Sequence, residues 1–306
     1  GRLENNQSFL TLNKFKPYFY IKSGDLSKAK KLAEFEAEKT EFTNFQGDSM
    51  TKLVINYPKD VSDIRRELEG AKIKTYESDI RFPIRFLIDH NIQGSLEIEG
   101  DYEGNEAIDR IHKDPDIKST DYIPKNLKIL SFDIESDKLG KKIYCISLYS
   151  KNYENAFIVS KDKVPRAVSC KDEAELLEKF REAVLDLDPD IITGWNVIDF
   201  DLQYLRDKFK KYRIPFDLGR ENTPTKLRLE TNFFRTSKAD MPGRVVLDGI
   251  DLTKSSFIKL ENYKLDTAAE SLLGTGKLIK DTGKQKYNEI DRLFKEDQKK
   301  LIEYNI

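Results

Sequence analysis

Residues 127–135 read Leu-Lys-Ile-Leu-Ser-Phe-Asp-Ile-Glu, a mostly apolar stretch that ends in two acidic residues. The apolar residues predict a strand that is buried inside a sheet. Because side chains alternate along a strand with period two, Asp133 and Glu135 lie on the same face and can reach one cation. The same spacing occurs in Asp101-Tyr-Glu103, which we interpret as a solvated loop. Spacing alone therefore does not establish a metal site.

Further elements are expected around this strand. The pattern predicts strands followed by an alternation of helices and strands, which favours an α/β domain with a mixed sheet flanked by helices. The expected strands span residues 142–149, 156–159, 190–194 and 244–248, and the expected helices span 171–187, 201–212, 265–273 and 298–304.

The first part of the chain predicts a smaller α+β domain. We expect strands at 18–21 and 52–56 and helices at 26–39, 63–68 and 80–90. Residues 101–125 are polar and contain Gly and Pro, which is typical of a linker or of a peripheral strand pair. Because 306 residues exceed the usual size of one domain, we predict two domains, 1–125 and 126–306.

Composition narrows the chemistry. Lys and Arg number 53 against 54 Asp and Glu, and this balance argues neither for nor against nucleic acid. Only two His and two Cys are present, so a disulfide framework or a histidine-based metal site is not expected, and Cys145 reads as a core residue. No apolar run approaches the roughly 18 residues of a membrane span. We expect an intracellular protein without a signal peptide or membrane partner, whose metal chemistry rests on carboxylates.

A third acid follows the predicted strand at 190–194. The sequence continues Trp-Asn-Val-Ile-Asp-Phe-Asp201, so that Asp201 begins a predicted helix. An acid favoured by the helix dipole is the alternative explanation. If this strand lies beside the first one, however, Asp201 joins Asp133 and Glu135. Oxygen ligands without histidine suit Mg²⁺ or Mn²⁺, and two such ions can activate a water and stabilise the leaving oxygen of a phosphodiester.

Phe132-Asp-Ile-Glu135 and Asn196-Val-Ile-Asp-Phe-Asp201 together resemble the first two exonuclease motifs of family B DNA polymerases. The third motif of that family is Tyr, three residues, then Asp. Lys299-Lys-Leu-Ile-Glu-Tyr304-Asn-Ile306 resembles its beginning, and the matching Asp would follow Ile306, the last residue of this sequence. Tyr287-Asn-Glu-Ile-Asp291 satisfies the spacing literally and is the alternative. The resemblance implies a ribonuclease H-like 3′→5′ proofreading exonuclease domain.

The resemblance also implies a role for each acid. Asp133 would bridge two Mg²⁺ or Mn²⁺ ions, Glu135 would hold the first ion and Asp201 the second, while Tyr304 would orient the attacking water. With the fourth carboxylate outside the 306 residues, we expect this piece to have impaired exonuclease activity.

The expected partner is DNA, as a single-stranded 3′ end and as a template strand. By resemblance, Asn196 and Phe200 would position the 3′-terminal nucleotide, Phe200 by stacking. The sequence carries no polymerase palm motif, so synthesis and any contact with a sliding clamp would belong to other parts of a parent polymerase. The family implies a cytoplasmic, nucleoid-associated prokaryotic protein.

The amino-terminal segment resembles the domain of archaeal family B enzymes that reads uracil in the template. By match with that domain, six residues would line a uracil pocket: Pro17, Tyr18, Pro58, Val61, Ile80 and Phe82. Arg81 departs from the archaeal pattern, which has proline at this position.

Two other functions remain open on the sequence. One is a free-standing 3′ exonuclease acting on DNA or RNA, and the other is a non-catalytic module that binds nucleic acid. The first would still require the three acids to hold metal, whereas the second would not.

Overall fold

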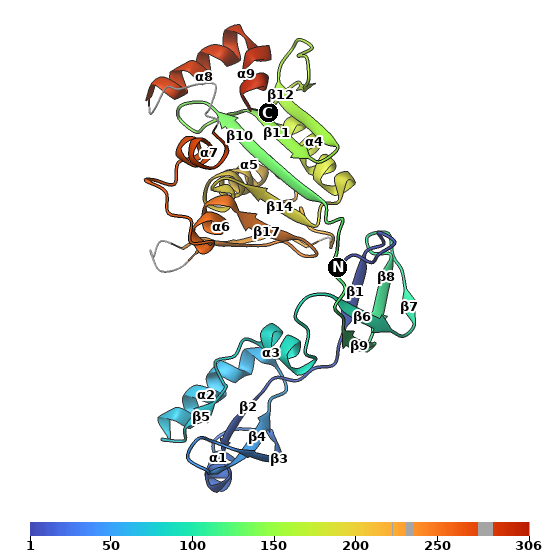
Figure 1. The fold of residues 1–306 in the computed structure, drawn as a ribbon, viewed down its shortest axis with the longest axis vertical. Helices are drawn as coiled ribbons and strands as arrows, with labels where there is room; N and C mark the ends of the chain where they lie inside the picture. The colour runs from blue at the N-terminus through green and yellow to red at the C-terminus, as the bar shows by residue number, and fades with distance from the viewer. Residues whose placement is uncertain (222, 231–235, 275–283, 306) are drawn as a thin grey trace. The chain divides into compact units, whose positions relative to one another are not determined.

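The computed structural model describes residues 1–221, 223–230, 236–274 and 284–305 (Figure 1). The chain forms two compact units. Unit 1 comprises Gly1–Ser8, Asn105–Asp109 and Lys125–Ile306, and unit 2 comprises Phe9–Gly104 and Arg110–Pro124. The predicted division at residue 125 differs in that residues 1–8 and 105–109 belong to unit 1.

Ion pairs explain why the first residues belong to unit 1. The Arg2 guanidinium lies 2.6 Å from an Asp188 carboxylate oxygen and 2.8 Å from an Asp190 oxygen. Arg220 pairs with both acids, and Arg244 pairs with Asp188. Because this contact joins residues far apart in sequence, the local pattern of the first eight residues could not reveal it.

Unit 1 is built on one six-stranded sheet with the order β13-β12-β11-β10-β14-β17. Strand β10 is antiparallel to β11 and parallel to β14, so the predicted mixed sheet is confirmed. The strands are β10 (Ile129–Ser136), β11 (Ile143–Ser150), β12 (Tyr153–Val159), β13 (Val168–Cys170), β14 (Ile191–Gly194) and β17 (Val245–Asp248).

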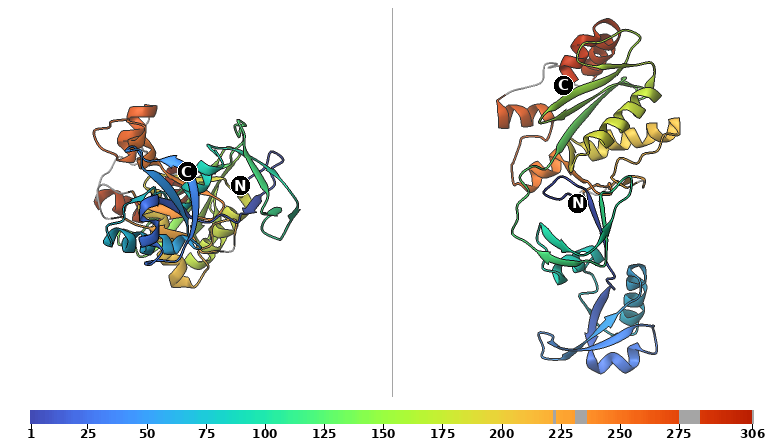
Figure 2. Two further views of the ribbon diagram at one scale, coloured as in Figure 1. Left: turned by 90° about the horizontal axis from the view of Figure 1, so that it is seen from below. Right: turned by 90° about the vertical axis from the view of Figure 1, so that its right-hand side faces the viewer.

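Helices cover both faces of this sheet. Helices α4 (Glu173–Leu187) and α5 (Gln203–Tyr212) pack their fully buried Phe180 and Phe209 into the larger core, and Figure 2 shows them together on one side of the sheet. Helices α8 (Lys284–Glu296) and α9 (Gln298–Asn305) pack against Tyr144 and Cys145 in a second core. The remaining elements of unit 1 are α6 (Gly249–Ser255), α7 (Leu265–Leu273), β15 (Lys226–Arg228) and β16 (Lys238–Asp240).

The predicted helix at 201–212 is only partly α-helical. Residues Val197–Leu202 form a π-helical turn, and α5 begins at Gln203. Asn196 opens the turn with φ of 62°, a left-handed conformation that Asn adopts more readily than most residues. Asp201 therefore lies within the π turn, and it does not begin the α-helix as we expected. Single π turns are frequent at functional sites.

Unit 2 contains a four-stranded sheet with the order β3-β4-β2-β5. Helix α1 ends at Ala29, residues 30–35 are in neither a helix nor a strand, and residues 36–39 of the helix predicted at 26–39 are instead part of a strand. Pairing with β4 overrides the local helical pattern there, since propensity is a weak prior. The elements are β2 (Tyr18–Lys22), α1 (Leu26–Ala29), β3 (Glu36–Thr43), β4 (Ser49–Val54), α2 (Val61–Gly70), β5 (Thr75–Tyr76) and α3 (Phe82–Asp89).

The polar stretch at 101–125 forms strands, so it is not an unstructured linker. Together with residues 9–12 and 96–99 it builds two small sheets, β1-β8-β7 and β6-β9. The strands are β1 (Phe9–Leu12), β6 (Leu96–Glu99), β7 (Tyr102–Glu103), β8 (Arg110–Lys113) and β9 (Asp116–Ser119).

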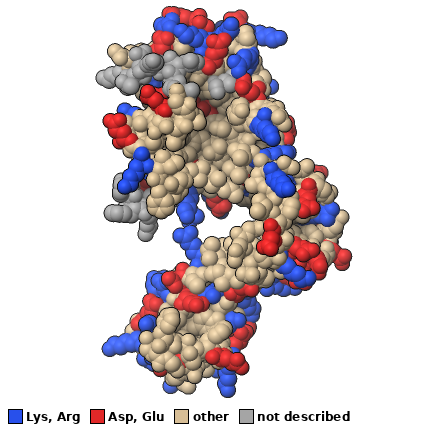
Figure 3. Space-filling model, in the orientation of Figure 1, with Lys and Arg blue, Asp and Glu red and all other residues tan. Residues whose placement is uncertain are grey.

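The surface carries charges of both signs, interspersed over each unit on the face shown in Figure 3. This distribution agrees with the net charge of −1. Within the described residues, every helix is too short or too polar to cross a membrane.

Candidate functional site

Strand β10 brings two of the predicted carboxylates to the edge of the unit 1 core. Asp133 pairs in register with Ser147 of β11, and Glu135 pairs with Cys145, just before the register shifts at Ser136. Glu135 is only 6% exposed. Both acids project from the same side of the strand, as the spacing predicted.

Strand β14 brings the third carboxylate beside them. It runs parallel to β10, with Ser131 opposite Thr193, so the carboxyl ends of the two strands meet at one edge of the sheet. The backbones approach closely here, because a Cβ atom on Gly194 would lie 2.9 Å from the Phe132 carbonyl oxygen. The π turn then returns Asp201 towards β10.

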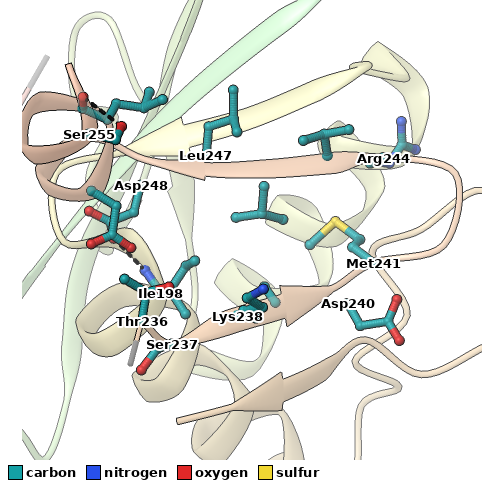
Figure 4. Close-up of a pocket in the computed structure, with 15 residues that line it drawn as sticks. Ile198, Thr236, Ser237, Lys238, Asp240, Met241, Arg244, Leu247, Asp248 and Ser255 are labelled. Atoms are coloured by element: carbon teal, nitrogen blue, oxygen red, sulfur yellow. Dashed lines mark hydrogen bonds between the residues drawn. The ribbon is translucent and has the colours of Figure 1, made fainter. Parts of the chain in front are cut away.

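The π turn is held in place from β17. An Asp248 carboxylate oxygen accepts a hydrogen bond from the Ile198 N–H at 3.2 Å, and the other oxygen accepts from Ile250 N–H. Figure 4 shows Asp248 and Ile198 at the border of a cavity of about 480 Å³, which also lies against β16 and β17. Asp248 thus fixes the backbone three residues before Asp201, a role that its position in the sequence did not reveal.

Asp201 is the most deeply buried of the three acids, at 1% exposure. Burial raises the pKa of its carboxyl group well above the usual value, and the neighbouring Asp133 and Glu135 carboxylates raise it further. Its Oδ1 atom is buried and has no hydrogen-bond partner within the described chain. A cation bound beside this oxygen would favour the ionised form of the carboxyl group and offset the cost of burying it.

Helices α8 and α9 add two polar groups beside these acids. The Lys286 ammonium lies 4.0 Å from a Glu135 carboxylate oxygen and 5.8 Å from the centre of the Tyr304 ring. The Tyr304 hydroxyl is buried and makes no close hydrogen bond among the described residues. Burial and the Glu135 charge raise the pKa of Tyr304 to about 12, against the opposing effect of Lys286. The tyrosine therefore stays protonated at neutral pH.

Asn305 connects the end of α9 to both strands. Its side-chain Nδ2 donates to the Asp133 Oδ2 atom at 3.0 Å, while its Oδ1 accepts from the Cys145 thiol at 3.4 Å. Its backbone carbonyl accepts from the Ser147 hydroxyl at 2.7 Å. Sequence reasoning missed both Asn305 and Lys286. The position of Asn305 next to Tyr304 was a usable signal, whereas no spacing rule identified Lys286.

The acid of the alternative tyrosine motif bonds to another side chain. Asp291 accepts a hydrogen bond from the Tyr144 hydroxyl at 2.9 Å, so its carboxylate bonds to an aromatic side chain of β11. The ring of Tyr304, in contrast, lies beside the Lys286 ammonium that faces Glu135.

The predicted nucleotide-binding residues lie at the start of the π turn and within it. Asn196 precedes it, and its side chain caps no helix. Phe200 lies within it, is 45% exposed and stacks on Tyr204 with ring centres 6.3 Å apart. An exposed aromatic face on a supported ring can accept a stacked base.

The acids fit a divalent cation in chemistry, although they do not form a closed cage. Across the described ranges, no three His, Cys, Asp or Glu side chains converge tightly enough to hold a metal by themselves. The donors are hard oxygens, as Mg²⁺ and Mn²⁺ prefer. Asp201 Oδ1 accepts no hydrogen bond within the described residues and could therefore bind a cation. Water and substrate oxygens would complete such a coordination shell.

In unit 2, the six residues predicted to form a pocket line a single cavity of about 260 Å³. Arg65, Arg81 and Arg85 line the same cavity. The six residues named from the resemblance thus lie around one cavity. The three arginines add positive charge to its lining, which the prediction did not include.

Comparison with known proteins identifies the family. Residues 73–268 match the family described as DNA polymerase family B, exonuclease domain. DNA polymerase II of Escherichia coli is 34% identical over 257 residues, which cover 81% of this chain and 32% of that protein. A DNA polymerase of Methanocaldococcus jannaschii is 26% identical over 320 residues, which cover 98% of this chain and 18% of that protein.

A solved structure shows the same fold. The family B DNA polymerase of Pyrobaculum calidifontis superposes with a TM-score of 0.79 at 21% identity, over 100% of this chain and 41% of that one. The chain thus spans about a third or less of the length of the curated relatives E. coli polymerase II and M. jannaschii polymerase. The predicted resemblance and fold are confirmed: the chain belongs to family B of the DNA polymerases and contains its exonuclease domain.

Proposed function

We propose that unit 1 removes nucleotides from the 3′ end of a DNA strand by metal-dependent hydrolysis. Asp133, Glu135 and Asp201 would hold one or two Mg²⁺ or Mn²⁺ ions. The observation that carries this proposal is the buried, unpartnered Oδ1 of Asp201 beside two further carboxylates. When bound, the cations would activate a water and stabilise the leaving 3′ oxygen.

The residues of the chain have distinct tasks in this proposal. Tyr304, protonated at neutral pH, donates a hydrogen bond that orients the attacking water. Lys286 places a positive charge beside Glu135, where the negative charge of the scissile phosphate must be accommodated. Asn305 keeps one Asp133 oxygen bonded and leaves the carboxylate in one orientation.

Phe200 and Asn196 would hold the terminal nucleotide. The exposed Phe200 ring, backed by Tyr204, offers a stacking surface for the base. The Asn196 amide would hydrogen-bond to the nucleotide from the other end of the same turn. The terminal nucleotide and Asp201 are then positioned by one six-residue π turn.

Degradation of a single-stranded DNA oligonucleotide with a 5′ label tests the proposal. In Mn²⁺ we expect slow shortening from the 3′ end, in keeping with the impaired activity expected for these 306 residues, and Asp133→Ala should abolish it. Asp101→Ala is the matched control, because Asp101 and Glu103 have the same spacing but lie on the exposed edge of unit 2. Shortening that survives Asp133→Ala would contradict the proposal.

The two other functions give different results. A free-standing exonuclease without preference would degrade an RNA strand at a similar rate. A non-catalytic module would bind no Mn²⁺ in calorimetry, and Asp201→Ala would change nothing. We infer that in a longer family B protein the domain edits the growing strand, in the cytoplasm and at the chromosome, and that any sliding-clamp contact lies in other parts of that protein.

For the cavity of unit 2 we propose that it receives one nucleotide of a template strand. All six residues expected from the resemblance line it, and Tyr18 and Phe82 supply aromatic surface. Uracil is the base that the resemblance predicts. Binding of 2′-deoxyuridine 5′-monophosphate by the protein tests this second role, and failure to bind any nucleotide would disprove it.

A further inference from the structure

The cavity of unit 2 has a strongly cationic wall. Three guanidinium groups line it, those of Arg65, Arg81 and Arg85, whereas Asp79 is the one carboxylate among its lining residues. We propose that the cavity recognises the phosphate group of a nucleotide and is indifferent to whether the base is uracil. This inference rests on the nucleotide-binding role proposed for the cavity, and it does not depend on the exonuclease site.

Arg85 is the buried centre of this wall. It is only 6% exposed, and its guanidinium lies over the Tyr18 ring, 4.6 Å from the ring centre. One terminal nitrogen donates to a Glu77 oxygen at 2.7 Å, and the other reaches the Tyr18 hydroxyl at 3.5 Å. The Nε atom is buried without a hydrogen-bond partner in the described chain. A fixed guanidinium with an unfilled donor is suited to an added anionic acceptor.

The other two arginines leave further donors at the cavity. The Arg65 Nε atom is also buried without a hydrogen bond among the described residues, and the Glu69 carboxylate is 3.9 Å from it. Arg81 is exposed and forms no ion pair with any described residue. Guanidinium groups bind phosphate oxygens with two parallel hydrogen bonds, which the separate carbonyl oxygens of uracil or thymine cannot accept in the same way.

Two helices begin at the same cavity. Helix α2 starts at Val61 and α3 starts at Phe82, and both residues line it. Neither helix has a side chain that caps its first turn. Helix α2 continues the 3-10 turn Pro58–Asp60, and Pro83 in the first turn of α3 has no N–H, so it is the positive ends of the helix dipoles that favour an anion here. The helix ends therefore add to the attraction of the three arginines.

Acidic groups near the cavity reduce this attraction, and Arg81 is the lining arginine that has no ion pair among the described residues. Glu77 is bound by Arg85, and Asp89 accepts a hydrogen bond from the Tyr18 hydroxyl at 2.7 Å. Asp79 remains as the acid of the lining. The volume of about 260 Å³ is just below the roughly 300–1,000 Å³ of most ligand pockets, which suits a single nucleotide fragment and not a longer strand.

Arginine side-chain NMR provides a direct test, because it reports on the Nε–H groups themselves. The intact protein is titrated with thymidine 5′-monophosphate, 2′-deoxyuridine 5′-monophosphate and 2′-deoxyuridine. We expect both monophosphates to shift the Arg85 resonance with dissociation constants within about three-fold of each other. The nucleoside, which lacks phosphate, should bind at least about ten-fold more weakly.

Variants locate the binding. Arg81 is exposed, so Arg81→Ala should not disturb folding. We expect this variant to bind both monophosphates at least about five-fold more weakly. Arg66→Ala is the matched control, because Arg66 lies on α2 with its charge paired to Asp63 and does not line the cavity. Inorganic phosphate should compete with the monophosphates.

The outcomes separate this inference from the role on which it rests. If 2′-deoxyuridine binds as tightly as its monophosphate and thymidine monophosphate does not bind, the base is read and the phosphate inference is wrong. If none of the three compounds binds, the nucleotide-binding role itself is wrong. Equal losses in Arg81→Ala and Arg66→Ala would likewise overturn the assignment to this cavity.

Discussion

At the scale of single residues, the site places Asp201 under electrostatic strain. Its carboxyl group is almost fully buried, one oxygen has no partner among the described residues, and two other carboxylates lie nearby. Such a group lowers the stability of the fold whenever it is ionised. A protein keeps such a residue when its function requires it, and the usual cost is stability.

Asp201→Asn should therefore stabilise unit 1 at neutral pH, by roughly 1–2 kcal/mol. The folded pKa of Asp201 is raised, so the wild-type protein loses stability as pH rises above the usual carboxyl value. The gain should accordingly vanish below about pH 4, where the carboxyl is protonated in both folded and unfolded chains. Urea unfolding of both proteins at pH 7 and pH 3.5 measures the difference, and a less stable variant at pH 7 would refute the prediction.

At the scale of elements, two strands and an ion-pair cluster set the framework of the site. The carboxyl ends of β10 and β14 deliver the acids, and their close approach depends on Gly194. Just before β14 in the chain, Asp188 and Asp190 form ion pairs with three arginines that come from separate parts of unit 1. Gly194 and the ion pairs of Asp188 and Asp190 both affect the site by fixing the position of β14.

Gly194→Ala should weaken both the fold and the site. The new methyl group would lie 2.9 Å from the Phe132 carbonyl oxygen and 3.0 Å from Val197. Backbone must then move, which we expect to cost about 1–3 kcal/mol and to reduce Mn²⁺ binding in calorimetry. Gly70→Ala is the control, because nothing lies within 4 Å of its added Cβ. Similar loss of Mn²⁺ binding in both variants would contradict this account.

Asp188→Asn should destabilise unit 1 by about 3 kcal/mol at neutral pH, because it takes the carboxylate partner from the buried Arg244 and leaves Arg2 and Arg220 with Asp190 alone. Burial alone would raise the pKa of Asp188, but Arg220, Arg2 and Arg244 outweigh burial and hold the pKa well below its usual range. The stability contributed by Asp188 is thus present above about pH 4 and is lost as pH falls further.

Chemical denaturation at pH 7 and at pH 3 checks the Asp188 prediction. The difference between wild type and variant should shrink at the lower pH. The exposed pair of Asp63 and Arg66 serves as control, since Asp63→Asn should change stability by no more than about 0.5 kcal/mol. A difference that stays constant with pH would rule out the proposed ionic origin.

At the scale of the whole molecule, each unit has its own hydrophobic core. The main core of unit 1 includes the buried Phe180, and the core of unit 2 includes the buried Phe19. Units with separate cores can lose structure separately. The two proposed roles, hydrolysis in unit 1 and nucleotide binding in unit 2, then rest on folds that respond independently to mutation.

Phe180→Ala and Phe19→Ala test this independence as a matched pair. Each should cost about 3–5 kcal/mol in its own unit, because a large buried ring is removed. Hydrogen exchange measured by mass spectrometry should show lost protection in unit 1 for the first variant and in unit 2 for the second. Loss of protection across both units in either variant would show that they unfold together.

The sequence by itself determined the strands of unit 1 and the acids they carry. Burial and alternation are local properties, so the apolar run at 127–132 predicted β10, and the spacing of Asp133 and Glu135 placed both on one face. The motif around Asp201 indicated the family, which the relatives confirm. These features depend on residues that are adjacent in the chain, so they can be predicted from the sequence alone.

Only the tertiary structure decided which groups meet. The hydrogen bond from the π turn to Asp248, the hydrogen bond from Asn305 to Asp133 and the ammonium of Lys286 beside Glu135 all join segments distant in the chain. The same reason explains why the predicted helix at 26–39 became partly a strand, since β4 supplied a partner that local propensity does not include. The sequence determined the chemical groups, and long-range packing determined their partners, their burial and hence their charge.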